Sequence, residues 1–199
     1  MIAIVDYGMG NIFSIRNALE KVGADVKVTS KAEELGNSDG VVIPGVGSFG
    51  DAMKQLLPFE EKIGDSIEDG IPFLGICLGM QILFEKSQES KEPGFGIIPG
   101  EVIRLPNNVL VPQMGWNEIE IKKGIDLLDG IENGDFFYFV HSYHCVPENR
   151  EMIIAITEYG TEVVAVINRD NIYAVQFHPE KSGKKGLLIL KNFLRSTRC

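Results

Sequence analysis

The first half of the chain alternates short, uninterrupted apolar runs with segments of helical periodicity, and this alternation restricts the fold more than any other feature. The apolar runs are residues 2–5, 41–43 and 73–76, and residues 26–29 form a further short β-branched run. Apolar residues recur at helical spacing in segments 11–22, 51–57, 59–68 and 78–84. Strands that are apolar on both faces occur in parallel sheets with helices packed against either side. We therefore expect an α/β fold of three layers around a mostly parallel central sheet.

Segments typical of strands dominate the second half of the chain. They are residues 97–105, 116–121, 136–145, 152–157, 163–168 and 172–177. Turn residues such as Tyr159-Gly160 separate several of them, so we expect an antiparallel, β-rich addition to the sheet. Leucines on one helical stripe predict a last helix over residues 186–196. No repeat or linker-like segment interrupts the chain, and we expect a single domain over residues 1–199.

Charge and cysteine content exclude several classes of function. The chain has 28 acidic and 19 basic residues and a net charge of −9, so its surface repels nucleic acids and anionic membranes. Its first apolar run lacks the flanks of a signal peptide, and no apolar run reaches the roughly 18 residues of a membrane-spanning helix. The three cysteines are widely spaced, unlike those of zinc ribbons or disulfide frameworks. We expect a cytoplasmic protein without a metal or cofactor.

Cys77 lies in a Gly-x-Cys-x-Gly sequence, residues 75–79, where an apolar strand meets a helical segment. This is the spacing of the nucleophile elbow Gly-x-Ser-x-Gly, with sulfur in place of oxygen. Glycines suit such a turn because its two backbones approach closely, and the amides at the start of the following helix favour a thiolate. A buried core cysteine is the alternative interpretation, so the catalytic one requires a base nearby.

Three histidines are candidates for that base. His141 and His144 lie in one strand-like run, where residues three apart point to opposite faces, so we interpret them as structural residues that do not bind a metal together. His178 differs because it follows the predicted strand 172–177 directly. We therefore select His178 as the candidate base.

A carboxylate stands two residues beyond this histidine, in the sequence His178-Pro179-Glu180. Pro179 biases its neighbour toward an extended backbone, in which residues 178 and 180 project to the same side. The Glu180 carboxylate would then orient the imidazole. With Cys77 as nucleophile, the three residues would form a catalytic triad at the carboxyl edge of a parallel sheet.

The segment 45–50 contains three glycines in the pattern Gly-x-Gly-x-x-Gly of dinucleotide-binding proteins. Asp69 precedes the next strand instead of ending it, so we disfavour a dinucleotide site. Amides of such a loop can instead face an oxyanion, and we expect the amides of Val46 and Leu78 to do so. A plain strand-to-helix turn is the alternative. Residues 183–186 lack the upstream glycine of a phosphate-binding loop and are interpreted as a first helical turn.

Several segments together carry a family resemblance. They are residues 6–11, 44–50, 75–81, 114–117, 139–143, 176–180 and 178–182. These segments resemble the class I (triad) glutamine amidotransferases, from the first strand to residue 182. The resemblance implies a flavodoxin-like sheet and L-glutamine as the substrate, with no cofactor.

The resemblance also implies a reaction in which Cys77 attacks the side-chain amide of glutamine. The Val46 and Leu78 amides would form the oxyanion hole. His178, held by Glu180, would protonate the departing ammonia and then activate water. The residues that resemble glutamine-binding positions are Gly47, Gln81, Glu89, Ser142 and Tyr143.

Within this family, the chain resembles members that pass ammonia to a separate (β/α)8-barrel cyclase subunit of histidine biosynthesis, as a heterodimer. The residues that resemble docking positions are Met114, Trp116, Asn117, Tyr138 and Lys181. The alternatives are an amidotransferase subunit of another synthase, of the pyridoxal phosphate or anthranilate type, and a related cysteine hydrolase. A flavodoxin-like binding module, in which Cys77 belongs to the core, is a third alternative.

Overall fold

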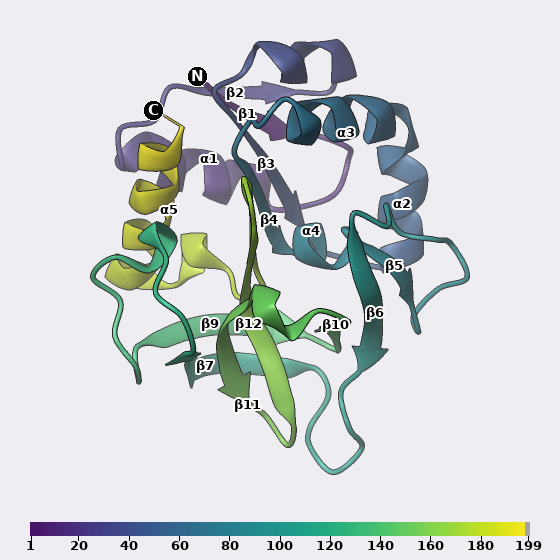
Figure 1. The fold of residues 1–199 in the computed structure, drawn as a ribbon, viewed down its shortest axis with the longest axis vertical. Coiled ribbons are helices and arrows are strands. Elements are labelled where there is room, and N and C mark those ends of the chain that lie inside the picture. Colours follow the sequence, from purple (N-terminus) through teal and green to yellow (C-terminus); the bar gives the residue numbers. More distant parts are fainter. Residues whose placement is uncertain (198–199) are drawn as a thin grey trace.

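An eight-stranded sheet runs through the centre of the computed structural model, which describes residues 1–197 (Figure 1). Side by side, its strands are β2 (Val26–Thr29), β1 (Ile2–Val5), β3 (Gly40–Gly45), β4 (Phe73–Cys77), β13 (Ile172–Val175), β12 (Glu162–Arg169), β11 (Ile153–Glu158) and β8 (Glu120–Ile121). The first five run parallel, and the last three continue the sheet antiparallel. The prediction of a mostly parallel sheet with an antiparallel addition is confirmed.

Helices cover both faces of this sheet (Figure 1). One face is covered by α1 (Ile12–Lys21) and α5 (Gly183–Ser196), and the other by α2 (Phe49–Leu56) and α3 (Glu60–Glu68). Alternate residues of β1 divide between two cores: Ile2 and Ile4 pack with α1 and α5, whereas Ala3 and Val5 pack with α2 and α3. The three-layer prediction is therefore confirmed. Within residues 1–197, every helix falls short of the length and hydropathy needed to cross a membrane.

Side chains mark the points where the chain leaves a parallel strand and enters a helix. Asn11 caps α1 by accepting a hydrogen bond from the amide of Ser14, and Ser48 caps α2 by accepting one from Asp51. Residues 183–186 form the first turn of α5, as expected. The 3₁₀ helices of the described chain are η1 (Ala32–Asn37), η2 (Leu57–Phe59), η3 (Asp126–Leu128), η4 (Arg150–Met152) and η5 (Pro179–Lys181).

Two smaller sheets flank the carboxyl edge of the parallel strands (Figure 1). One contains β5 (Phe84–Ser87), β6 (Ile98–Arg104) and β10 (Tyr143–Pro147), and the other pairs β7 (Gln113–Glu118) with β9 (Phe136–His141). The sulfur of Cys77, at the end of β4, lies 3.7 Å from the carbonyl oxygen of Val140 in β9. The β7–β9 pair therefore lies against this edge of the central sheet.

Three predicted elements are divided in the structure. The segment 116–121 breaks at Ile119 into β7 and β8, which belong to different sheets. The run 136–145 is not one strand: it breaks at Ser142 into β9 and β10, which belong to different sheets. The helix predicted over 78–84 is a single turn, α4 (Leu78–Gln81), and β5 begins at Phe84. Pairing with β6 accounts for the divisions of 136–145 and 78–84, because β10 and β5 flank this strand. Apolar periodicity does not reveal such long-range pairing.

The two ends of the described chain lie together at the amino edge of the parallel strands. The carbonyl of Met1 accepts a hydrogen bond from the amide of Asp39, just before β3. Thr197 lies against the first residue of β3, since a Cβ on Gly40 would be 2.7 Å from its methyl carbon. The ends are therefore at the opposite edge of the sheet from Cys77.

We predict that Gly79→Ala severely destabilises the fold. An added Cβ would lie 1.9 Å from the backbone oxygen of Ile43, so β3 would have to separate from the turn after β4. We expect a loss of about 3 kcal/mol or more in the free energy of unfolding, measured by urea denaturation. The control is Gly64→Ala in α3, where nothing lies within 4 Å of the new Cβ and the change should stabilise by up to about 1 kcal/mol. Equal effects of the two substitutions would contradict the prediction.

Candidate active site

Cys77 occupies a sharp turn between β4 and α4. Its φ is +56°, a left-handed conformation that costs a residue with a side chain roughly 1–3 kcal/mol. The turn closes tightly, because a Cβ on Gly75 would lie 2.4 Å from the backbone oxygen of Gly79. The side chain is only 6% exposed. These features are those of the nucleophile elbow that the sequence predicts.

The sulfur has two hydrogen-bonding neighbours from segments distant in the sequence. The Sγ of Cys77 donates toward the carbonyl oxygen of Val140 at 3.7 Å, and the Nε2 of Gln176 donates to this sulfur at 3.5 Å. The helix after Cys77 was expected to favour a thiolate, but α4 has one turn and aligns few peptide dipoles. The contribution expected from the helix is therefore small.

His178 and Glu180 form a buried pair. Their Nδ1 and Oε1 atoms are 2.8 Å apart, and both side chains are almost completely buried. The pairing agrees with the prediction, and His178 itself is extended as predicted. The predicted extended backbone through residue 180 is wrong, because Glu180 lies in η5, whose first residue is Pro179. A 3₁₀ turn brings residue 180 back toward residue 178, and the amide of Lys181 bonds to the His178 carbonyl at 3.0 Å.

The environment of His178 raises its pKa to about 10. Burial lowers this pKa, but the interactions of the ring with Cys77 and Glu180 raise it by more. The Nε2 of His178 is buried and has no hydrogen-bond partner within residues 1–197. In this geometry Cys77 acts on the imidazole electrostatically, without a formed hydrogen bond.

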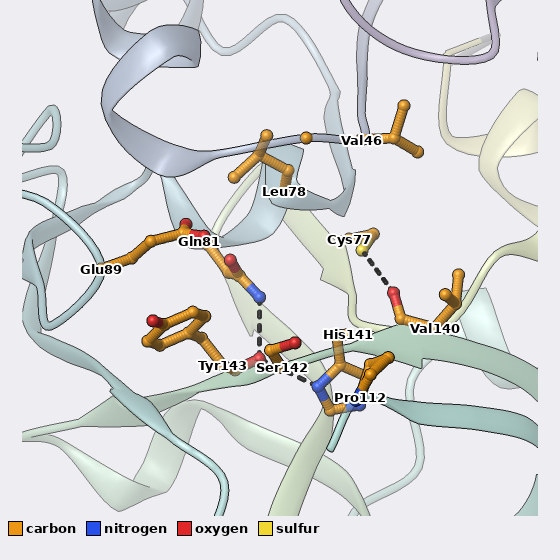
Figure 2. Close-up of a pocket in the computed structure, with 11 residues that line it drawn as sticks. Val46, Cys77, Leu78, Gln81, Glu89, Pro112, Val140, His141, Ser142 and Tyr143 are labelled. Atoms are coloured by element: carbon orange, nitrogen blue, oxygen red, sulfur yellow. Dashed lines mark hydrogen bonds between the residues drawn. The ribbon is translucent and has the colours of Figure 1, made fainter.

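A cavity of about 220 Å³ opens beside the sulfur (Figure 2). Eight residues predicted for the site line it: Val46, Gly47, Cys77, Leu78, Gln81, Glu89, Ser142 and Tyr143. Pro112, Val140 and His141 complete the lining, whereas His178 and Glu180 lie outside it. The structure thus brings the predicted oxyanion and glutamine-binding residues together around Cys77.

The polar groups of the cavity are held in place by the surrounding protein. The Nε2 of Gln81 donates to the carbonyl of Tyr143 at 2.9 Å and to the Oε1 of Gln176 at 3.0 Å, and Figure 2 shows the first of these bonds. Glu89 accepts a hydrogen bond from the amide of Phe49 at 2.7 Å. The Gln81 oxygen and the Glu89 carboxylate are therefore fixed acceptors beside the cavity, a set suited to an ammonium group.

His141 is a buried member of the site that the sequence interpretation left as a structural residue. Its Nδ1 lies 2.9 Å from the Tyr143 carbonyl, which only accepts, so this nitrogen carries the proton. Burial lowers the pKa of His141 to about 4, helped by the nearby His144 and His178 and opposed by the Tyr143 bond. The ring is neutral at pH 7.

Within residues 1–197, no three His, Cys, Asp or Glu side chains are placed to hold a metal ion.

Gln176 was missed as a site residue. It is fully buried, yet it contacts both Cys77 and Gln81. The sequence signal for Gln176 is an amide side chain in an otherwise apolar strand segment, two residues before His178. Buried polar side chains rarely lack a partner, so this position could have been identified as a site residue.

Most of the predicted docking residues gather on the outer face of β7 and β9. Met114 and Trp116 are 66% and 56% exposed, and Trp116 packs edge-on against Tyr138 with ring centroids 6.1 Å apart. The Nζ of Lys181 lies 5.8 Å from the centre of the Tyr138 ring. We call Met114, Trp116, Tyr138 and Lys181 the docking face. Asn117 alternates to the other side of β7 and bonds to the Glu158 carbonyl, so it does not join them.

The fold and the elbow site define a class of protein, and comparison with known families identifies it. The model of the family described as glutamine amidotransferase class-I matches residues 3–197. The chain belongs to this family.

Curated relatives narrow the assignment. Imidazole glycerol phosphate synthase subunit HisH of Caldanaerobacter subterraneus subsp. tengcongensis is 51% identical to this chain. The protein of the same name from Methanothermobacter thermautotrophicus is 52% identical to it. Each match covers 100% of both chains. The solved structure of PurLQS from Thermotoga maritima shares the fold, with a TM-score of 0.79 at 18% identity over 98% of this chain and 97% of that one. Identity of this level along the full length places the chain among the HisH subunits.

We predict that His141 makes the stability of the protein sensitive to mild acid. Between pH 6.5 and about 4 the unfolded chain binds a proton at this residue and the folded protein does not, so stability falls as the pH falls. An asparagine at this position would keep a donor for the Tyr143 carbonyl without titrating. Between pH 7 and pH 5, His141→Asn should therefore lose about 2 kcal/mol less than the wild type in the free energy of unfolding.

Urea denaturation of both proteins at each pH tests this prediction. From pH 7.5 to 8.5 the imidazole is neutral in both states, so the difference between the two proteins should stay constant as an internal control. Parallel loss of stability in the two proteins between pH 7 and pH 5 would contradict the role assigned to His141.

Proposed function

We propose that the chain is the glutaminase subunit of an imidazole glycerol phosphate synthase. It hydrolyses L-glutamine to glutamate and ammonia through a thioester on Cys77, and a cyclase subunit uses the ammonia to make imidazole glycerol phosphate and aminoimidazole carboxamide ribonucleotide. The observation that carries the proposal is the strained Cys77 turn beside the buried His178–Glu180 pair. Full-length identity with HisH subunits favours this synthase over the pyridoxal phosphate and anthranilate types and over a cysteine hydrolase.

In the first half-reaction, the γ-glutamyl group moves to Cys77. The raised pKa of His178 supports a thiolate–imidazolium pair at neutral pH. The sulfur bonds to the amide carbon, and the carbonyl electron pair moves to the oxygen, where the Val46 and Leu78 amides donate. Leu78 begins α4, so its amide has no acceptor within that helix. His178 protonates the nitrogen, the C–N bond breaks and ammonia leaves.

In the second half-reaction, water hydrolyses the thioester. Neutral His178 removes a proton from the water as its oxygen bonds to the thioester carbon. The tetrahedral oxyanion again meets the amides of Val46 and Leu78. The C–S bond breaks, glutamate leaves, and the thiolate–imidazolium pair is restored. Glu180 holds the ring through Nδ1 and stabilises its charged form throughout.

Substrate recognition is assigned to the fixed polar lining of the cavity. The α-ammonium group of glutamine would bind the Glu89 carboxylate and the Gln81 oxygen. Ser142 and Tyr143, at the break between β9 and β10, and Gly47 would complete the pocket. Bound in this way, glutamine would point its side-chain amide toward Cys77.

The partner is assigned as a (β/α)8-barrel cyclase subunit that binds the docking face in a heterodimer, in the cytoplasm. Met114 and Trp116 are exposed and Tyr138 is half-buried, and side chains of these three types are enriched in interface cores. β9 connects this face to the site, because Tyr138 lies on the docking face and the Val140 carbonyl faces the sulfur of Cys77. The whole chain, residues 1–199, acts as one domain, since strands from both halves share the central sheet.

We predict that Cys77→Ala abolishes glutamine-dependent synthesis but not ammonium-dependent synthesis. In the complex with the cyclase, glutamine-dependent formation of imidazole glycerol phosphate should fall by about 10³-fold or more, because no other group can carry the γ-glutamyl intermediate. Activity with added ammonium salt should stay within about twofold, since only ammonia generation is lost. Cys145→Ala, which removes a buried thiol paired with β6, is the control and should retain glutamine-dependent activity. Intact glutamine-dependent synthesis by Cys77→Ala would exclude the proposed mechanism.

We predict that Trp116→Ala weakens binding of the cyclase. A large aromatic residue at the centre of an interface typically contributes about 2 kcal/mol or more, so the dissociation constant should rise roughly 30-fold, measured by titration calorimetry. Leu57→Ala, at an exposed apolar position between α2 and α3, is the matched control and should leave the dissociation constant unchanged. Equal affinity of the Trp116→Ala variant and the wild type would rule out the docking face as the binding surface.

A further inference from the structure

Gln176 connects the nucleophile to the glutamine pocket, although the mechanism above does not use it. Its side chain is 0% exposed and follows the end of β13. At one end, Nε2 donates to the Cys77 sulfur at 3.5 Å. At the other, Oε1 accepts from the Nε2 of Gln81 at 3.0 Å. A buried amide that is hydrogen-bonded through both its nitrogen and its oxygen, next to the proposed nucleophile, indicates a role beyond filling the core.

One carbonyl group determines the direction of every hydrogen bond in this series. The Tyr143 oxygen only accepts, so the group that Gln81 presents to it at 2.9 Å must be its NH₂. The second hydrogen on that nitrogen faces Gln176, which must therefore present its oxygen. The nitrogen of Gln176 is then the atom that faces Cys77. Turning either amide around would place two donors or two acceptors together.

This fixed direction has a consequence at each end. At the sulfur, an N–H donor favours the thiolate over the thiol, because a thiolate accepts more strongly. At the cavity, both hydrogens of the Gln81 nitrogen are used, so its oxygen remains available to the substrate. Without Gln176, one of the two hydrogens on the Gln81 nitrogen would have no acceptor.

We propose that Gln176 is a positioning residue of the glutaminase: it stabilises the Cys77 thiolate through Nε2 and holds the Gln81 amide with its oxygen toward glutamine. The inference rests on the proposed function, in which Cys77 is the nucleophile.

The test is the pH dependence of Cys77 alkylation in Gln176→Met. Methionine has a similar length and volume but neither an N–H nor a carbonyl group. The full-length protein is treated with iodoacetamide at a series of pH values, and modification is followed by mass spectrometry of the peptide that contains Cys77. We expect the rise of the alkylation rate with pH to move to higher pH, with a several-fold slower rate in the acidic part of the series, because the sulfur has lost a hydrogen-bond donor. In the complex, the KM for glutamine should also rise several-fold.

The matched control is Asn192→Leu in α5. Asn192 is an equally buried amide that donates to the carbonyls of Leu127 and Asp129, away from the cavity. This variant should lower stability and leave the alkylation profile of Cys77 unchanged. If Gln176→Met does not fold, Gln176→Asn serves instead, because its shorter side chain withdraws the nitrogen from the sulfur and should shift the profile in the same direction.

Alkylation requires no turnover, so the two hypotheses can fail separately. A folded Gln176→Met or Gln176→Asn protein with the wild-type alkylation profile would overturn the role of Gln176 alone. Glutamine-dependent activity in Cys77→Ala, found together with an unshifted alkylation profile in Gln176→Met, would instead contradict the proposed function itself. A shifted profile in Gln176→Met and an unshifted one in Asn192→Leu support the inference.

Discussion

The left-handed backbone at Cys77 is the constraint on which the rest of the site depends. The conformation is unfavourable for a residue with a side chain, and the surrounding packing maintains it. A Cβ on Gly45 would lie 2.6 Å from the Cβ of Leu78, so β3 and the turn after β4 meet without a gap. The same contact fixes the backbone of Leu78, which carries one of the proposed oxyanion donors. The proposed nucleophile and the proposed oxyanion hole therefore share one rigid support in the central sheet.

β9 links the remaining parts of the site to this support. Its inner residue Phe137 stacks on Phe177 with centroids 4.2 Å apart, which buries the segment leading to His178. The carbonyl of Tyr138 accepts the His178 amide at 2.9 Å, and the Val140 carbonyl faces the Cys77 sulfur. The strand that carries part of the docking face thus contacts both the nucleophile and the backbone of the base. A partner bound to that face would act on both through one element.

Local signals in the sequence predicted the parallel strands, the elbow and the His178–Glu180 pairing. Each depends on residues close together in the chain, such as a buried apolar run or flanking glycines. The structure differs from the predictions where contacts between segments distant in the sequence determine the local conformation. The break at Ser142 and the short α4 follow from pairing with β6, and Gln176 meets partners 95 and 99 residues away. The carboxylate beside His178 was predicted for a reason that is wrong, since a 3₁₀ turn replaces the extended backbone.

The position of the two chain ends has a practical consequence for engineering. Met1 and Thr197 lie next to the start of β3, at the edge of the sheet opposite Cys77. Purification tags, fluorescent reporters or surface anchors attached at either end would therefore leave the cavity and the docking face accessible. A short peptide joining the two ends would span little distance, which makes the fold a suitable candidate for circular permutation.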